Sequence, residues 1–193
     1  NVRAENKSRT YGDANPVFTA SYNGFKNSQN FNNSGINGAP GLETEADELS
    51  DVGAYSIQAS NGGLNSGNYD FRFEPGTLTV GKAKITVRAN DTSRTYGDAN
   101  PTFDVTYNGF KNGQNLGNSG ISGNPVLNTE ADELSDAGTY PIVAAKGGLD
   151  AGNYDFELQQ GTLTIAKAMI TVRANDTGRI YGDNNPVFRA SYS

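Results

Sequence analysis

The sequence contains no cysteine, no histidine and no tryptophan, and it has a single methionine. The absence of cysteine excludes disulfides and thiol nucleophiles. The absence of histidine excludes imidazole bases and one of the commonest zinc ligands. Stability must therefore come from the burial of apolar side chains and not from cross-links.

Basic patches and long apolar runs are missing as well. The chain has 15 basic and 21 acidic residues, a net charge of −6, and no long run of one sign. This balance argues against nucleic-acid binding and against attraction to an anionic membrane surface. No apolar stretch approaches the roughly 18 to 20 residues that a helix needs to span a bilayer, so we expect no membrane insertion.

What the sequence does have is a repeat with a period of 85 residues and no gap. Tyr-Gly-Asp-Ala-Asn-Pro occupies residues 11–16 and 96–101, and it returns at 181–186 with Asn in the fourth place. The acidic stretch Thr-Glu-Ala-Asp-Glu-Leu-Ser-Asp occupies both 44–51 and 129–136. A strict period of this size indicates an array of near-identical modules, each large enough to be a small domain.

We therefore predict two β-rich modules, residues 1–81 and 82–166, followed by the truncated start of a third module at 167–193. The joints at 81–84 and 166–169 contain no Pro-rich or Ser-rich spacer. So short a connection restricts swivel and favours an extended rod. The third copy holds two candidate strands, which cannot bury a core alone. We expect it to dock on the second module of a monomer or to exchange strands with another chain; the alternative is that the true unit is offset along the chain.

Apolar and polar side chains alternate in several runs of each module; Phe103, Val105 and Tyr107, for example, are separated by polar residues. A period of two is typical of half-buried strands. In the second module it predicts strands at 85–89, 103–107, 140–144, 154–158 and 163–165, with equivalents in the first module and a sixth strand around Val126 and Leu127. Pro75-Gly76 and Gln160-Gly161 separate the last two strands of each module and predict tight hairpins.

These patterns predict an all-β, β-dominated fold made of elongated tandem modules of about 85 residues. Each module is expected to be either an immunoglobulin-like sandwich or a β-grasp-like arrangement. The second alternative requires a helix across the sheet, and the sequence offers at most a single helical turn in 25–33 or 45–49. Residues 26–41 and 111–125 are rich in Asn, Gly and Ser and predict a long loop.

Several motifs together resemble the MBG domains of the Tyr-Gly-x type. They are the Tyr-Gly-Asp-x-Asn-Pro opening, the Gly-Thr-Tyr at 138–140, the later Asn-Tyr and the Gly-Thr-Leu-Thr-Ile at 161–165. The resemblance covers both complete modules and the opening of the third. Such domains recur in large bacterial surface proteins and in filamentous haemagglutinin-like adhesins. The resemblance implies a location outside the cell or on its surface, with glycans or mucins as partners, and it carries over no catalytic or binding residue.

The strongest local signature is the opening motif, for which a structural turn explains every position. Glycine permits a positive φ, Asp and Asn side chains bond the backbone of a turn, and proline fixes the entry to the next strand. The tyrosine ring can cover the core while its hydroxyl reaches solvent. The predicted turn residues are Tyr11, Gly12, Asp13, Asn15, Pro16, Tyr96, Gly97, Asp98, Asn100 and Pro101.

The acidic loop is a candidate calcium site, because calcium favours several carboxylate and carbonyl oxygens. The candidate ligands are Glu130, Asp132, Glu133 and Asp136, with counterparts in the first module. Their spacing does not match the EF-hand loop, so a solvated acidic loop is the favoured interpretation. No other cofactor is expected.

Phe25 and Phe110 follow Asn-Gly turns and fall outside the alternation, so they are candidates for stacking on sugar rings. The alternative is a core plug beneath the long loop, which is the commoner role of phenylalanine. A covalent Lys–Asn bond between Lys84 and Asn153, as in pilin-like modules, is a minor alternative, because the sequence does not reveal the buried acid that it requires.

We therefore expect no enzyme but a structural stalk or spacer of a bacterial cell-surface or secreted adhesin, which projects a distal binding region. The alternative is weak, multivalent binding of glycans or mucins, made effective by avidity. Paired carboxylates leave a glycoside-acting enzyme as a remote alternative, which would need a deep cleft that holds two of them.

Overall fold

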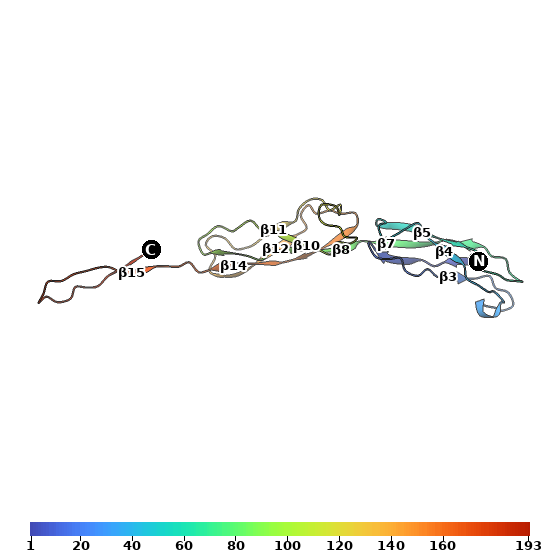
Figure 1. Cartoon of the computed structure of the whole chain (residues 1–193), viewed down its shortest axis with the longest axis horizontal. Helices are drawn as coiled ribbons and strands as arrows, with labels where there is room; N and C mark the ends of the chain where they lie inside the picture. Colours follow the sequence, from blue (N-terminus) through green and yellow to red (C-terminus); the bar gives the residue numbers. More distant parts are fainter. The chain divides into compact units, whose positions relative to one another are not determined.

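The computed structural model describes all 193 residues, and strands are its main regular elements (Figure 1). It contains no α-helix, and its single helical element is the 3-10 turn η1 (Phe31–Asn33). No helix has the length and apolar character that a membrane crossing requires. The all-β fold predicted from the sequence is confirmed. The β-grasp alternative, which needs a helix across the sheet, is wrong.

The first repeat contains two small sheets. The three-stranded sheet has the order β3 (Ala20–Tyr22), β1 (Val2–Ala4), β6 (Phe73–Glu74). The four-stranded sheet has the order β2 (Lys7–Thr10), β7 (Gly76–Gly81), β5 (Gly53–Ser60), β4 (Gly41–Glu43). β1 pairs with β6, and β2 with β7, in parallel, whereas the other pairs are antiparallel.

The second repeat has the same strands at the same offset along the chain. Its sheets have the orders β10 (Val105–Asn108), β8 (Ala83–Ala89), β13 (Tyr154–Gln159) and β11 (Val126–Asn128), β12 (Gly138–Ala145), β14 (Gly161–Ala166), β9 (Thr92–Thr95). The third copy, red in Figure 1, contains only the antiparallel pair β15 (Val172–Ala174) and β16 (Ala190–Tyr192). The sixth strand that the sequence suggested around Val126 is therefore present as β11.

Two segments of each repeat run through both of its sheets. In the first repeat, β1 continues into β2 and β6 continues into β7, and the two segments stay paired in parallel. The chain therefore keeps its direction at Pro75-Gly76 and does not fold back. The predicted hairpins at Pro75-Gly76 and Gln160-Gly161 are wrong. A proline, which cannot donate to a strand ladder, suits the point where a strand leaves one sheet as well as it suits a turn.

Two strands, β2 and β9, have no counterpart among the predicted ones. Their sequences, Lys-Ser-Arg-Thr and Thr-Ser-Arg-Thr, contain no apolar residue, so no alternation marks them. Each lies at the edge of its four-stranded sheet. The inward positions belong to Arg9 and Arg94, which are buried despite their charge.

Each sheet of the first repeat has its own apolar cluster. Val2, Ile36 and Leu64 lie at the centre of the first cluster, which is surrounded by aromatic side chains of the long loop and of the segment before β6. Ile57 of β5 and Leu78 of β7 lie at the centre of the second cluster. The Asn-rich loop is therefore a folded cover of the three-stranded sheet.

Contacts along the chain form two compact units, and these do not coincide with the repeats. One unit comprises residues 1–88, 105–126 and 144–159, and the other comprises 89–104, 127–143 and 160–193. The first unit thus joins the first repeat to the three-stranded sheet of the second. The module boundaries predicted from the sequence stay a prediction.

Replacement of Gly76 by alanine should lower the free energy of unfolding by about 1–3 kcal/mol, because a side chain there overpacks the contact between the two parallel segments. A Cβ at Gly76 would lie 2.5 Å from the carbonyl oxygen of Ala4, and one at the equivalent Gly161 would lie 2.4 Å from that of Ala89. Urea denaturation followed by tyrosine fluorescence measures the change. Gly67→Ala is the matched control, since no atom lies within 4 Å of its Cβ position. Equal midpoints for the two variants would contradict this account.

Candidate functional site: the interface between successive repeats

Each complete repeat holds a buried arginine in a set of hydrogen bonds. In the first repeat, Arg9 donates through Nε to Oδ1 of Asn15 at 2.8 Å, and through its Nη atoms to the carbonyl oxygens of Thr10 and Asp47. Asn15 Nδ2 in turn donates to the carbonyl oxygen of Ala46 at 2.7 Å. The arginine and the asparagine together tie the opening motif to the acidic loop, and we call this set the arginine clamp.

The second repeat reproduces the arginine clamp. Arg94 Nε lies 2.7 Å from Oδ1 of Asn100, and Asn100 Nδ2 donates to the carbonyl oxygen of Ala131, also at 2.7 Å. Arg94 also donates to the carbonyl oxygens of Thr95 and Asp132. Each nitrogen of the guanidinium thus donates to an acceptor, which allows the charge to be buried.

The opening motif forms a turn in both repeats. The amides of Asp13 and Asp98 each donate, at 3.1 Å, to the carbonyl oxygen three residues earlier. Gly12 and Gly97 have φ values of 81° and 89°, a conformation that favours glycine. The structure differs from the sequence interpretation in the role of the asparagine, since its side chain links the arginine of β2 or β9 to the acidic loop instead of bonding the turn.

The acidic loop does not gather its carboxylates. Asp132 Oδ1 accepts hydrogen bonds of 3.0 Å from the Leu134 amide and the Ser135 hydroxyl, so this carboxylate stabilises the loop itself. The side chains of Glu130, Asp132, Glu133 and Asp136 form no group of three or more that could hold a metal ion. The four calcium candidates are therefore neighbours along the loop without a shared site.

Phe25 and Phe110 each pack edge-on against a tyrosine of the same repeat. The Phe110 and Tyr154 ring centroids lie 6.2 Å apart, and those of Phe25 and Tyr69 lie 5.9 Å apart, with interplanar angles of 78° in both. Both phenylalanines are half-buried. This position at the base of the long loop corresponds to the plug that the sequence offered as the alternative to sugar stacking.

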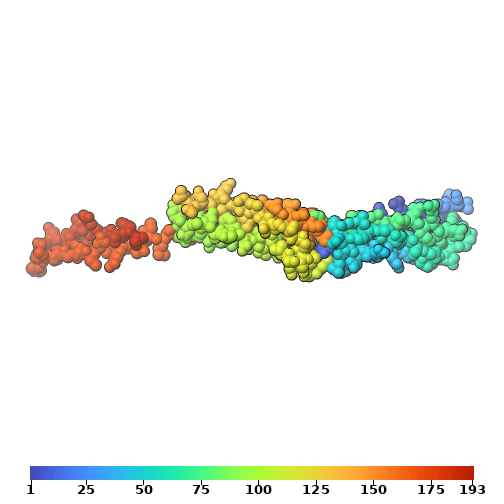
Figure 2. Space-filling model, turned by 90° about the horizontal axis from the view of Figure 1, so that it is seen from above, coloured from blue at the N-terminus to red at the C-terminus, as the bar shows by residue number.

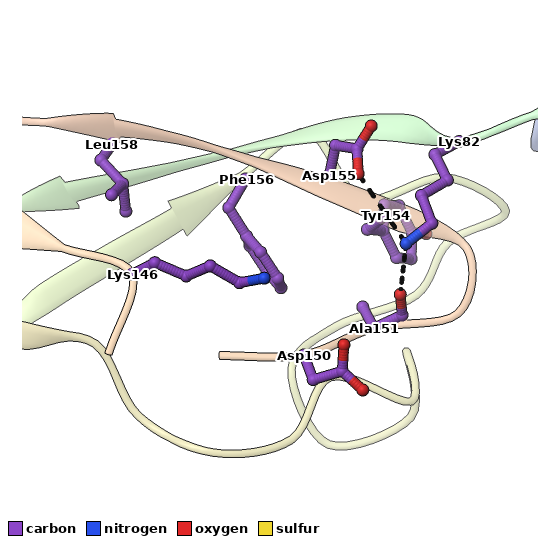
Figure 3. A pocket seen from close by; sticks show the side chains of 8 residues that line it. All are labelled: Lys82, Lys146, Asp150, Ala151, Tyr154, Asp155, Phe156 and Leu158. Atoms are coloured by element: carbon purple, nitrogen blue, oxygen red, sulfur yellow. Dashed lines mark hydrogen bonds and ion pairs between the residues drawn. The ribbon is translucent and has the colours of Figure 1, made fainter. Parts of the chain in front are cut away.

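The first and second repeats are joined by a single residue, because β7 ends at Gly81 and β8 begins at Ala83. That residue, Lys82, is itself held in place. Its Nζ donates to the carbonyl oxygen of Ala151 at 2.9 Å and lies 3.8 Å from Asp155 Oδ1 (Figure 3). The connection between the two repeats is therefore fixed on the surface of the second.

One apolar cluster extends across the joint. It includes Tyr11 and Val80 from the first repeat and Ile85, Val87 and Tyr154 from the second. The rings of Tyr11 and Tyr154 meet edge to face, with centroids 5.5 Å apart and an interplanar angle of 81°. Their exposed fractions are 3% and 1%. The end of one repeat and the start of the next thus share a core.

Polar contacts surround this shared cluster. Lys111 Nζ lies 2.8 Å from Asp13 Oδ1, and the long loop that carries Lys111 meets the cyan surface of the first repeat in Figure 2. The side chain of Asn153 makes two hydrogen bonds, accepting from the Val52 amide at 2.9 Å and donating to Asp51 Oδ1 at 2.7 Å.

A further bond links Asn112 Nδ2 to the carbonyl oxygen of Glu48 at 3.2 Å. We call the surface of the first repeat that takes part its C-terminal face. It comprises Tyr11, Asp13, Glu48, Asp51 and Val52. The opposing surface of the second repeat is its N-terminal face, which comprises Phe110, Lys111, Asn112, Asn153 and Tyr154.

The sequence is similar to a known protein family, and the similarity follows the same two repeats. A family model for the MBG domain (YGX type) matches residues 1–79 and again residues 85–164. The chain belongs to the MBG domain family. The resemblance seen in the sequence is confirmed, and MBG domains are repeat modules of surface proteins. No curated protein matches the chain.

Three contact residues of the joint between the repeats were predicted as site residues for other roles: Tyr11 and Asp13 for a turn, and Phe110 for sugar stacking. The sequence did not indicate the polar contacts that Lys111, Asn112 and Asn153 make. Lys111 and Asn153 lie on polar loops, where lysine and asparagine are ordinary. The sequence marks these two residues by recurrence, because Lys26 and Asn68 occupy the equivalent positions of the first repeat, 85 residues earlier. The Lys84 and Asn153 side chains have other partners, so the arrangement does not support a covalent bond between them. Lys84 Nζ lies 3.9 Å from Glu157 Oε2, and the Asn153 side chain forms hydrogen bonds with the first repeat.

Replacement of Asn100 by alanine should lower the free energy of unfolding by about 1–3 kcal/mol, because Arg94 Nε then faces no side-chain acceptor. Chemical denaturation measures the change. The equivalent residue in the third copy, Asn185, is exposed and serves as the matched control. We expect N185A to stay within about 0.5 kcal/mol of the parent chain. An N100A chain as stable as N185A would show that the arginine clamp contributes nothing.

Proposed function

We propose that this chain is a stalk or spacer segment of a bacterial cell-surface or secreted adhesin, and that its repeats hold a distal binding region away from the cell. The observation that carries the proposal is the joint between the first two repeats. A flexible tether needs no contacts, whereas this joint has a shared apolar cluster and polar contacts around it.

The joint supports a mechanical role because its parts limit both bending and rotation. A one-residue connection removes the slack that lets tandem domains swivel. The Tyr11–Tyr154 contact near the centre and the Lys111–Asp13 and Asn153–Asp51 contacts resist rotation about the connection. Fixed joints let the lengths of successive modules add up, which is what a spacer requires.

The proposal includes the absence of catalysis. Four surface hollows are each lined by two acids: Glu43 and Glu45, Asp47 and Glu48, Asp132 and Glu133, and Asp150 and Asp155. All of these carboxylates are exposed to solvent, whereas a general acid needs a desolvated carboxyl group. Position 43 is occupied by Asn128 in the second repeat, so the Glu43–Glu45 pair is not a property of the module.

Distance measurements across the joint test the stalk proposal. The chain has no cysteine, so spin labels can be attached at Q58C and Q159C alone, two exposed positions on either side of the joint. We expect a single narrow distance distribution between the labels. A K111A/N153A variant should broaden it, because the polar contacts around the connection are removed.

K26A/N68A is the matched control for this experiment. It removes the same residue types at the same positions of the first repeat, where they contact no preceding repeat in this structure. Its distribution should remain as narrow as that of the parent. A broad distribution in the parent chain would mean that the joint swivels and would exclude the role of a stiff spacer.

A further inference from the structure

A small hollow of about 230 Å³ lies beside the start of β13 in the second repeat (Figure 3). Phe156 and Leu158 of this strand give the hollow an apolar side, and two lysines and two aspartates surround the rest. Both apolar side chains are half-buried, so part of their surface remains accessible. A cavity below the size that holds a drug-like molecule suits a single ring of a ligand.

One lysine and one aspartate of the hollow are held together. Lys82 Nζ lies 3.8 Å from Asp155 Oδ1 and donates to the carbonyl oxygen of Ala151 at 2.9 Å. A lysine ammonium has three donors, so Lys82 still has one to offer. This pair is therefore a fixed edge of the hollow, and its charges are already balanced.

The other lysine and aspartate of the hollow have no partner. The Lys146 ammonium and the Asp150 carboxylate form no hydrogen bond or ion pair, with each other or with another residue, and both side chains are exposed. Figure 3 shows Lys146 extended toward the ring of Phe156, with Asp150 on the loop below. One free cation and one free anion thus border the same aromatic surface.

The first repeat shows that these two free charges are not needed for the fold. Asn61 and Asn65 stand at the equivalent positions, whereas the ring recurs as Phe71. Asn61 Nδ2 donates to the carbonyl oxygen of Leu64 at 3.2 Å and so stabilises its own turn. In the second repeat, Lys146 makes no such bond. This repeat lacks a hydrogen bond that holds the loop and has in its place a charge beside the hollow.

We propose that the hollow binds an acidic sugar residue, a ring that carries a carboxylate and several hydroxyl groups. Lys146 pairs with the carboxylate, Asp150 accepts hydrogen bonds from hydroxyl groups, and the apolar face of the sugar ring lies on Phe156. The remaining donor of Lys82 is available to a further hydroxyl group.

The three groups of the hollow together select this ligand class. A neutral sugar leaves Lys146 without a counter-charge, and a simple carboxylate leaves Phe156 and Asp150 unused. Hexuronates and sialic acids both carry the carboxylate and the hydroxyl groups on one ring. The inference does not rest on the stalk role, because it concerns a hollow on the side of one repeat.

Titration of the full, ¹⁵N-labelled chain followed by NMR tests the proposal. The probes are galacturonate and N-acetylneuraminate, with galactose as the neutral match and acetate as the simple carboxylate. We expect at least one acidic sugar to shift the amide signals of 146–151 and 154–158 with a Kd of about 1–10 mM, because exposed charge pairs around a single ring bind weakly. Galactose and acetate should bind at least about tenfold more weakly, because each lacks one of the matched groups. The acid that binds more tightly identifies the source of the carboxylate.

Variants of the hollow supply the matched comparison. K146N/D150N gives the second repeat the residues of the first, so it should fold as the first repeat does, and it should bind the acidic sugar at least about tenfold more weakly. F156L keeps an apolar side chain but removes the flat ring, and it should weaken binding by about the same factor. K26N removes an exposed lysine that is not part of the hollow and should bind as the parent does.

Four results would each overturn the proposal of an acidic-sugar site. They are no shift of these signals by either acidic sugar, equal affinity for galactose or acetate, parental affinity in K146N/D150N, and parental affinity in F156L. The amide spectrum of each variant shows whether it is folded, so that a loss of binding is assigned to the hollow and not to unfolding.

Discussion

The tyrosine on the C-terminal face of the first MBG repeat is buried by the repeat that follows it. Tyr11 is 3% exposed, whereas the equivalent Tyr96 of the second repeat is 43% exposed. The local sequence around the two residues is almost identical, so the difference lies in what covers them. Stability in such a chain is shared between neighbours, as in other linear repeat proteins. The repeat of the sequence and the compact unit of the structure are consequently out of phase.

The arginine clamp prepares the surface that the next repeat covers. Arg9 and Asn15 hold the opening motif against the acidic loop through the carbonyl oxygens of Ala46 and Asp47. The same loop then offers the carbonyl oxygen of Glu48 and the carboxylate of Asp51 to the following repeat. The buried arginine of one repeat thus helps to position the polar groups that contact the next repeat.

The sequence predicts the parts of this fold that depend on side-chain alternation. Strand β8 is an example, since Ile85, Val87 and Ala89 mark it and all three are fully buried. Strand β2 escapes prediction because its inward side chain is a hydrogen-bonded arginine. The alternation also says nothing about the direction of the chain, which is why a hairpin is expected between β6 and β7 although β6 simply continues into β7.

The joint is harder still to predict, because its contacts come from loops. Lysine and asparagine on a glycine-rich loop are typical of a solvated surface, and only the structure reveals that Lys111 and Asn153 face another repeat. Comparison of the copies inside the chain gives a partial signal, since the same residues recur at Lys26 and Asn68. Recurrence identifies residues that the module retains, but it does not tell which of them lie side by side.

The parallel pairing of the first and last segments of a repeat has a consequence for a chain under tension. The chain enters the first repeat through β1 beside β6, and it leaves through β7 beside β2, with both segments running the same way. Pulling the two ends apart slides these segments past each other along their length. The hydrogen bonds between them are then loaded in shear and at the same time, and they do not open one after another as in a zipper. Such a module yields only when many bonds fail together, so it is strongest in the direction in which a tethered chain is stretched.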